Sequence, residues 1–141
     1  MSVNDDYDLQ RFVTAQNGCF DRVCNELSAG RKQSHWMWFI FPQIRGLGRS
    51  HMAEAFAIAS KDEAAAYVNH SVLGPRLREC TQLVTEVEGR TLEEILGYPD
   101  NLKFRSSMTL FAEAADDNQI FVGALRKCCN GELDPSTLDR L

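Results

Sequence analysis

Apolar residues recur at steps of three and four over the first thirty positions of the chain. These residues are Leu9, Phe12, Val13, Phe20, Val23, Cys24 and Leu27. Asn17-Gly18 interrupts the pattern, and Gly30 ends it. The spacing therefore predicts two amphipathic helices, at about 7–16 and 19–29.

Capping signals divide the chain after residue 50 into further helices. Ser60-Lys-Asp-Glu63 and Thr91-Leu-Glu-Glu94 have the Ser/Thr-x-x-Glu form of a capping box. The predicted helices start near residues 51, 61, 71, 92, 101, 118 and 135, with Ser50, Asp100 or Asn101, and Asp134 as further caps. The helix after Ser50 is expected to continue through Ile58. A narrow apolar stripe marks the long helix that starts near 71, and it consists of Leu73, Leu77, Cys80, Val84 and Val87.

Residues 31–50 read RKQSHWMWFIFPQIRGLGRS and differ from the rest of the chain. They include both tryptophans and four of the basic side chains, but no Asp or Glu. Ser34 is expected to cap a short helix over about 36–41. Alternation would also allow a strand, but no second strand-like run offers it a partner, so a buried helix is preferred. Gly46-Leu47-Gly48 predicts a turn.

The pattern as a whole predicts one all-α domain over residues 1–141, with eight or nine helices and a flexible segment at 1–6. A hydrophobic content of 44% and a charged content of 25% are ordinary for a globular domain. The formal net charge of -5 argues against broad nucleic-acid binding, but it leaves room for a local anion site. The acidic N-terminus lacks the order of a signal peptide, and the apolar run 36–42 is too short to span a bilayer. A cytosolic protein with no membrane contact is expected.

The five cysteines have neither zinc-site nor disulfide-framework spacing, because no CxxC pair is present. Reduced thiols, several of them packed as small apolar groups, are the expected state. The three histidines form no metal-binding pattern such as HExxH. No metal site and no cofactor is predicted.

Cationic side chains gather around the predicted turn and point to an anion site. They are Arg31, Lys32, His35, Arg45, Arg49 and His51. Arginine can bind a phosphate or carboxylate through two parallel hydrogen bonds, and Gly46 and Gly48 would let backbone N–H groups approach the anion. The alternative is a solvated basic loop paired with acidic helices elsewhere in the fold.

His35, beside Trp36, is the candidate catalytic residue. A histidine near large aromatic rings can be partly desolvated and act as a general acid or base near neutral pH. The competing interpretation is a structural donor to a backbone carbonyl. On a helix, Trp36 and Trp38 would point about 200° apart, so one should pack inward and the other could stack on a ligand.

Residues 103–111 combine a core face with crowded polar side chains. Lys103, Ser106, Ser107 and Thr109 occupy the first turns of the predicted helix, where Ser and Thr are mediocre helix formers. Their hydroxyls should therefore bind either the backbone of the aromatic stretch or a ligand. Neither serine lies in a GxSxG or SxxK motif, so neither is a predicted nucleophile.

Four segments together resemble a bacterial family of unknown function, domain-of-unknown-function family 1810. They read RKxSHWMWFIFPQ at 31–43, GLGxS at 46–50, VLGPRL at 72–77 and DxxKFxSSMTLF at 100–111. The resemblance covers about residues 9–129 and implies an all-helical single domain, without an established activity, cofactor or catalytic residue. The label "calpastatin" sometimes given to the family gains no support here, because such an inhibitor should read as a disordered, repeat-bearing chain.

The leading hypothesis is a pocket for an anionic, phosphate-bearing or nucleotide-like small molecule. Its lining would be Arg31, Lys32, His35, Gln43 and Lys103, with Trp36 or Trp38 as a stacking wall. If the protein is an enzyme, hydrolysis or glycosyl transfer with His35 as acid/base would suit such a site. The rival hypothesis is a non-enzymatic interaction module whose basic rim docks an acidic partner. A contact of His35 with Lys103 and Ser106 would join the two halves of the chain into one site.

Overall fold

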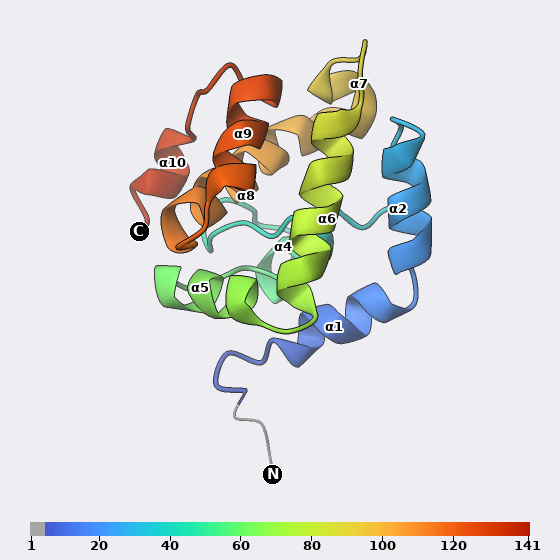
Figure 1. Ribbon diagram of the computed structural model, residues 1–141. Helices are drawn as coiled ribbons and strands as arrows, with labels where there is room; N and C mark the ends of the chain where they lie inside the picture. Colours follow the sequence, from blue (N-terminus) through green and yellow to red (C-terminus); the bar gives the residue numbers. More distant parts are fainter. Residues whose placement is uncertain (1–4) are drawn as a thin grey trace.

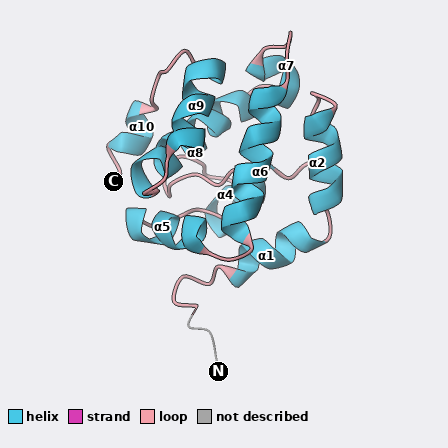
Figure 2. Ribbon diagram, in the orientation of Figure 1, coloured by secondary structure: helices cyan, strands magenta, loops and turns pink. Residues whose placement is uncertain are grey.

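A computed structural model describes residues 5–141, which form ten helices joined by loops (Figure 2). The helices are α1 Gln10–Asn17, α2 Phe20–Ser28, α3 Met37–Ile40, α4 His51–Ala55, α5 Lys61–Asn69, α6 Leu73–Glu86, α7 Leu92–Leu96, α8 Asp100–Ala114, α9 Gln119–Cys128 and α10 Pro135–Leu138. The described part of the chain holds no strand, only an isolated parallel bridge between Ile44 and Ile58. The all-α prediction is confirmed, with one helix more than the upper count expected.

Helices α6 and α8 organise the core. α6 contacts α2, α5 and α9, and α8 contacts α5, α7, α9 and α10 (Figure 1). In the predicted stripe of α6, Leu73, Leu77, Cys80 and Val84 are buried, whereas Val87 follows the last helical residue and is only half-buried. The core face of α8 carries Phe104, Met108 and Phe111, all fully buried.

The first helix starts later than predicted, because the residues before it form turns. The carboxylate of Asp5 accepts hydrogen bonds from the N–H groups of Leu9 (2.6 Å) and Gln10 (3.0 Å). Asp8 has a φ of 52°, which is not helical. α1 therefore begins at Gln10. Of the flexible segment predicted at 1–6, residues 1–4 lie outside the described residues.

One predicted capping box is complete and the other is divided. Thr91 and Glu94 make both reciprocal bonds at the start of α7. Ser60 accepts from the N–H of Glu63, but the Glu63 carboxylate binds the N–H of Ala59 and the guanidinium of Arg11. At the start of α8, neither Asp100 nor Asn101 caps, because Pro99 occupies the N-cap position.

Helix α4 ends at Ala55, so the prediction that it continues through Ile58 was wrong. Beyond α4, the chain adopts an extended conformation around Ile58. The N–H of Ile58 donates to the carbonyl of Gln43 (2.9 Å), and the N–H of Arg45 donates to the carbonyl of Ile58 (2.8 Å). This pairing with a distant segment outweighs the helical tendency and places the loop 45–49 beside residues 56–58.

Arg11 of α1 fixes the same region from the other side. Its guanidinium donates to the carbonyls of Ala55 (3.0 Å) and Ala57 (2.9 Å) and forms an ion pair with Glu63 (3.0 Å). Glu63 is 3% exposed, so this pair lies at the edge of the core. The end of α4 is thus held by a residue more than forty positions earlier in the chain.

Two absences can be stated for residues 5–141. None of their helices has both the length and the apolar character needed to cross a bilayer. Within the same range, no cluster of three or more His, Cys, Asp or Glu side chains could hold a metal ion.

All five cysteines are free thiols, and burial raises the pKa of each.

Candidate functional site

The segment before α3 is fixed by a single carboxylate, that of Glu26 on α2. It accepts hydrogen bonds from the N–H of Gln33 (2.7 Å), the N–H and hydroxyl of Ser34 (2.9 and 2.6 Å) and the indole of Trp36 (3.0 Å). Burial alone would raise the pKa of Glu26, but these donors outweigh it and lower the pKa to about 2. Ser34 therefore binds Glu26, and it does not cap α3 as predicted.

The two tryptophans have different surroundings. Trp36 is 1% exposed, and the ammonium of Lys32 lies 5.1 Å from its ring centroid. Trp38 is half-buried, and the ammonium of Lys103 lies 5.8 Å from its ring centroid. Trp36 is therefore the buried tryptophan and Trp38 the partly exposed one, although Trp36 precedes the first residue of α3 and the two do not lie on one helix as expected.

Asp100 joins the first half of the chain to α8. Its carboxylate forms ion pairs with Lys32 (3.0 Å) and Lys103 (3.5 Å). The exposed fraction of the side chain is 9% for Lys32 and 28% for Lys103. The backbone N–H of Lys32 also donates to the carbonyl of Ile95 (2.7 Å). Both lysines of the predicted ligand site are thus already paired within the protein.

The hydroxyl groups of α8 bind the loop before α10. Ser106 donates to the carboxylate of Asp134 (2.7 Å), and the backbone N–H of Asp134 donates to the hydroxyl of Thr109 (2.9 Å). Burial opposes ionisation of Asp134, but hydroxyl donors that include Ser106 hold its pKa below the ordinary value. Ser107 is fully buried, and its hydroxyl has no hydrogen-bond partner among residues 5–141. The hydroxyls of Ser106 and Thr109 also donate to the carbonyls of Leu102 (3.2 Å) and Arg105 (2.8 Å), so they bind this loop and their own helix and not the backbone of residues 36–41.

Arg31 and His35 lie at the surface. Among residues 5–141, the side chain of neither residue makes a hydrogen bond or an ion pair. Within this described range, no hydrogen bond joins His35 to Lys103 or to Ser106. The structure brings the two segments together through the ion pairs of Asp100 and the ring contact of Phe41 with Phe104 (centroids 4.9 Å apart), and not through His35.

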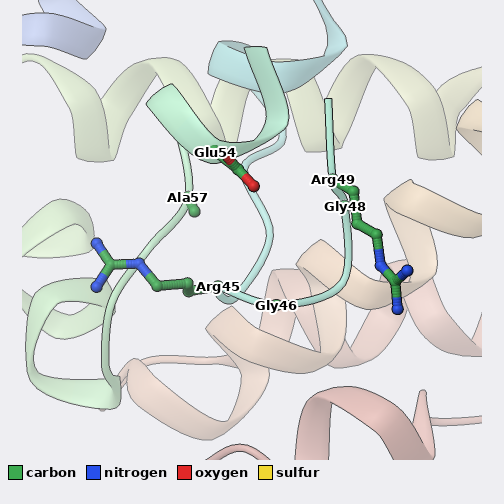
Figure 3. Close-up of a pocket in the computed structure, with 6 residues that line it drawn as sticks. All are labelled: Arg45, Gly46, Gly48, Arg49, Glu54 and Ala57. Carbon is green, nitrogen blue, oxygen red and sulfur yellow. The ribbon is translucent and has the colours of Figure 1, made fainter. Parts of the chain in front are cut away.

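A hollow of about 550 Å³ lies on the loop 45–49. Its lining residues are Arg45, Gly46, Gly48, Arg49, Glu54 and Ala57 (Figure 3). A crevice of about 10 Å³ adjoins it, shares Gly46 and Gly48, and is also lined by Trp38 and Gln43. The structure therefore brings together four of the predicted site residues, Trp38, Gln43, Gly46 and Gly48, while Lys103 lies over the same tryptophan.

The charged side chains of the hollow have no side-chain partners among the described residues. Figure 3 shows Glu54 directed between the two chain segments, with Arg45 and Arg49 on opposite sides. None of these three makes an ion pair or side-chain hydrogen bond within residues 5–141. The backbone N–H groups of residues 46–49 likewise donate to no group in the described chain. The hollow is thus bordered by two arginines and one glutamate whose charged groups are unpaired within the described residues.

The two glycines of the loop have packing reasons of their own. Gly46 has a φ of 101°, and a Cβ there would lie 3.0 Å from the guanidinium carbon of Arg140. A Cβ on Gly48 would lie 2.6 Å from the Cβ of Ala53. Both positions therefore need glycine for the loop to pack, whether or not an anion approaches it.

Sequence reasoning missed Glu54 and Ala57. Glu54 is the lone carboxylate of the hollow, and it lies outside the cationic stretch that drew attention. A helix continuing through Ile58 would have placed it on an ordinary exposed face. Only the early end of α4 brings these residues beside the 45–49 loop.

Comparison with known proteins supports the same fold and assigns no activity. The profile of the family described as "Protein of unknown function (DUF1810)" matches residues 6–141. The chain is similar to the conserved hypothetical protein Rv1873 from Mycobacterium tuberculosis, whose crystal structure shares 55% sequence identity, with a TM-score of 0.96 and coverage of 97% of this chain and 98% of that one. No curated protein matches the sequence. On the match over nearly its whole length, the chain belongs to the DUF1810 family.

Proposed function

We propose that the protein binds a phosphate-bearing small molecule in the hollow on the 45–49 loop. The observation that carries the proposal is the contrast between two sets of cations. Lys32 and Lys103 share the carboxylate of Asp100, whereas Arg45 and Arg49 have no partner in the described chain. Unpaired guanidinium groups at a concave surface are free to bind an oxyanion from solution.

The backbone of the loop supports the same ligand. The backbone N–H groups of residues 46–49 donate to no group within the described chain, and three of these residues, Gly46, Gly48 and Arg49, line the hollow. Successive free amides near a turn stabilise anions through hydrogen bonds and their partial positive charge. Guanidinium and amide donors together favour a phosphate group over a neutral ligand.

Isothermal titration calorimetry with pyrophosphate tests this proposal. We expect saturable binding that weakens about tenfold in Arg45→Ala and in Arg49→Ala, because each substitution removes a charge-assisted hydrogen bond. Arg22→Ala, which removes an exposed arginine on α2 outside the hollow, is the matched control and should bind like wild type. The absence of binding, or equal binding by all three variants, would contradict the proposal.

Binding in the hollow does not require the candidate catalytic residue, His35. His35 as acid/base in hydrolysis or glycosyl transfer stays a prediction, and this residue does not line the hollow. His35→Ala should therefore leave pyrophosphate affinity unchanged. A phosphate-bearing ligand of this kind also fits the cytosolic location expected from the sequence.

A second candidate is the docking of an acidic partner through a basic rim. The observation that favours it is the placement of Arg45 and Arg49 on opposite sides of the loop (Figure 3). Titration with a hexaglutamate peptide separates the two functions. A partner-docking surface should bind this peptide more tightly than pyrophosphate, whereas a phosphate site should show the reverse order.

A further inference from the structure

We infer that the ligand of this hollow is a sugar phosphate, whose adjacent hydroxyl groups bind the carboxylate of Glu54. This inference rests on the proposed function and names the class of molecule that the site takes. A site built for a bare oxyanion gains nothing from a carboxylate, because two negative groups in one hollow repel each other. The presence of Glu54 therefore needs a second kind of group on the ligand.

Glu54 is available to such a group. It lies on the exposed side of α4, its side chain points between the two chain segments that border the hollow (Figure 3), and it forms no ion pair with Arg45 or Arg49. An ionised carboxylate is an acceptor only, so its partner on the ligand must be a donor. The donor is a hydroxyl or a positively charged amine.

The charge around the hollow selects the hydroxyl. Arg45 and Arg49 line it with Glu54, and the guanidinium of Arg140 lies beside Gly46, where its Nη2 donates to the Gly46 carbonyl at 3.4 Å. Three cationic groups against one carboxylate leave a net positive surface, which disfavours an amine. A vicinal diol, by contrast, can donate one hydrogen bond to each carboxylate oxygen while the phosphate binds the arginines.

The dimensions of the site exclude ring stacking as the main source of affinity. The hollow, at about 550 Å³, falls in the ordinary range of small-molecule sites. The crevice next to Trp38 is about 10 Å³, room for about one water molecule and not for a nucleobase. The recognised unit is therefore the sugar with its phosphate, and a base would extend into solvent.

A pair of ligands that differ in one hydroxyl tests the inference. Ribose 5-phosphate and 2-deoxyribose 5-phosphate are titrated against wild type, Glu54→Gln and the control Glu79→Gln, an exposed glutamate on α6. We expect wild type and the control to prefer the ribose compound about tenfold, since a hydrogen bond to a charged acceptor discriminates by this order. In Glu54→Gln the preference should fall below about twofold, while pyrophosphate binds as well or more tightly because a repelling charge is gone.

The outcomes separate this inference from the proposed function. Arginine-dependent binding of pyrophosphate without preference between the two sugars overturns the inference alone, and so does a preference that survives in Glu54→Gln. If no phosphate compound binds, both fail. Melting curves confirm that the variants fold. Glu54→Asp, which keeps the charge on a shorter side chain, serves as a second variant, and its preference should lie between those of wild type and Glu54→Gln.

Discussion

The indole Nε1 of Trp36 donates a 3.0 Å hydrogen bond to the carboxylate of Glu26, ten residues earlier in the chain. The same carboxylate holds the backbone of residues 33 and 34. The segment of residues 33–36 is thereby attached to α2 just before the chain enters the core at α3. This relationship, and not a cap at Ser34, determines where the buried tryptophan lies.

Removal of the Glu26 carboxylate should destabilise the fold. Glu26→Ala leaves the Trp36 indole and two backbone N–H groups without their acceptor, and we expect the free energy of unfolding to fall by about 2–3 kcal/mol. Urea denaturation measures the change. Glu79→Ala, at an exposed position where the side chain has no hydrogen bond or ion pair with the described residues, should change it by less than about 0.5 kcal/mol. Equal effects of the two substitutions would contradict the structural role of Glu26.

The same carboxylate predicts a specific acid sensitivity. Its pKa falls from an ordinary value of 4.5 to about 2 on folding. Because the folded-state pKa is the lower one, Glu26 stabilises the fold above pH 4.5, and this contribution is lost as the pH falls from 4.5 towards 2. Melting temperatures of wild type and Glu26→Gln should therefore converge across that window. A difference that stays constant from pH 7 to pH 2.5 would show that ionised Glu26 contributes no stability.

Two neighbouring serines on α8 offer a matched comparison. Both are buried, but Ser106 donates to Asp134 at 2.7 Å, whereas the Ser107 hydroxyl has no partner in the part of the chain that the structure describes. Ser106→Ala should cost about 1–2 kcal/mol, because the Asp134 carboxylate loses a donor. Ser107→Ala should leave stability unchanged or raise it by up to about 1 kcal/mol, because an unsatisfied buried hydroxyl is removed. Chemical denaturation of both variants checks this order, and the reverse order would contradict it.

Two helical glycines should respond oppositely to alanine. A Cβ on Gly74 would lie 2.1 Å from the carbonyl oxygen of Val68, so Gly74→Ala forces the backbone apart and should cost about 3 kcal/mol. A Cβ added to Gly123, in the interior of α9, would meet no described atom within 4 Å apart from its chain neighbours and the backbone of its own helix. Gly123→Ala should stabilise by about 0.5–1 kcal/mol, because alanine is the better helix former. Thermal unfolding of both variants measures the two changes in stability. Changes of the same sign would contradict this prediction.

The elements that sequence predicted well are those fixed by neighbours in the chain. The capping box at Thr91 and the Ser60 cap of α5 depend on contacts three residues away, and both helices begin where predicted. The helix ends that differ from the prediction are set by contacts between distant segments. α4 ends early because Ile58 pairs with residues 43–45, and Asp100 does not cap α8 but binds Lys32, 68 positions earlier. A local pattern carries no information about such partners.

The candidate site divides in the same way. The turn at Gly46-Gly48 and the closeness of Gln43 and Trp38 follow from adjacency, and these residues do border one hollow and its crevice. Which cations would be paired could not be read from the sequence, because the pairing depends on where Asp100 lies in space. Glu54 was missed for the same reason: its place in the hollow depends on a helix end set by tertiary contacts.

The hydrogen bonds of Arg11 to the carbonyls of Ala55 and Ala57 have a consequence for the shape of the hollow on the 45–49 loop. Ala57 lines that hollow, so a side chain from α1 holds part of its lining in place. The amino-terminal helix α1 thus supports the segment that faces the 45–49 loop. Shortened versions of the protein that begin after this arginine should keep their helical content yet lose the shape of the recess.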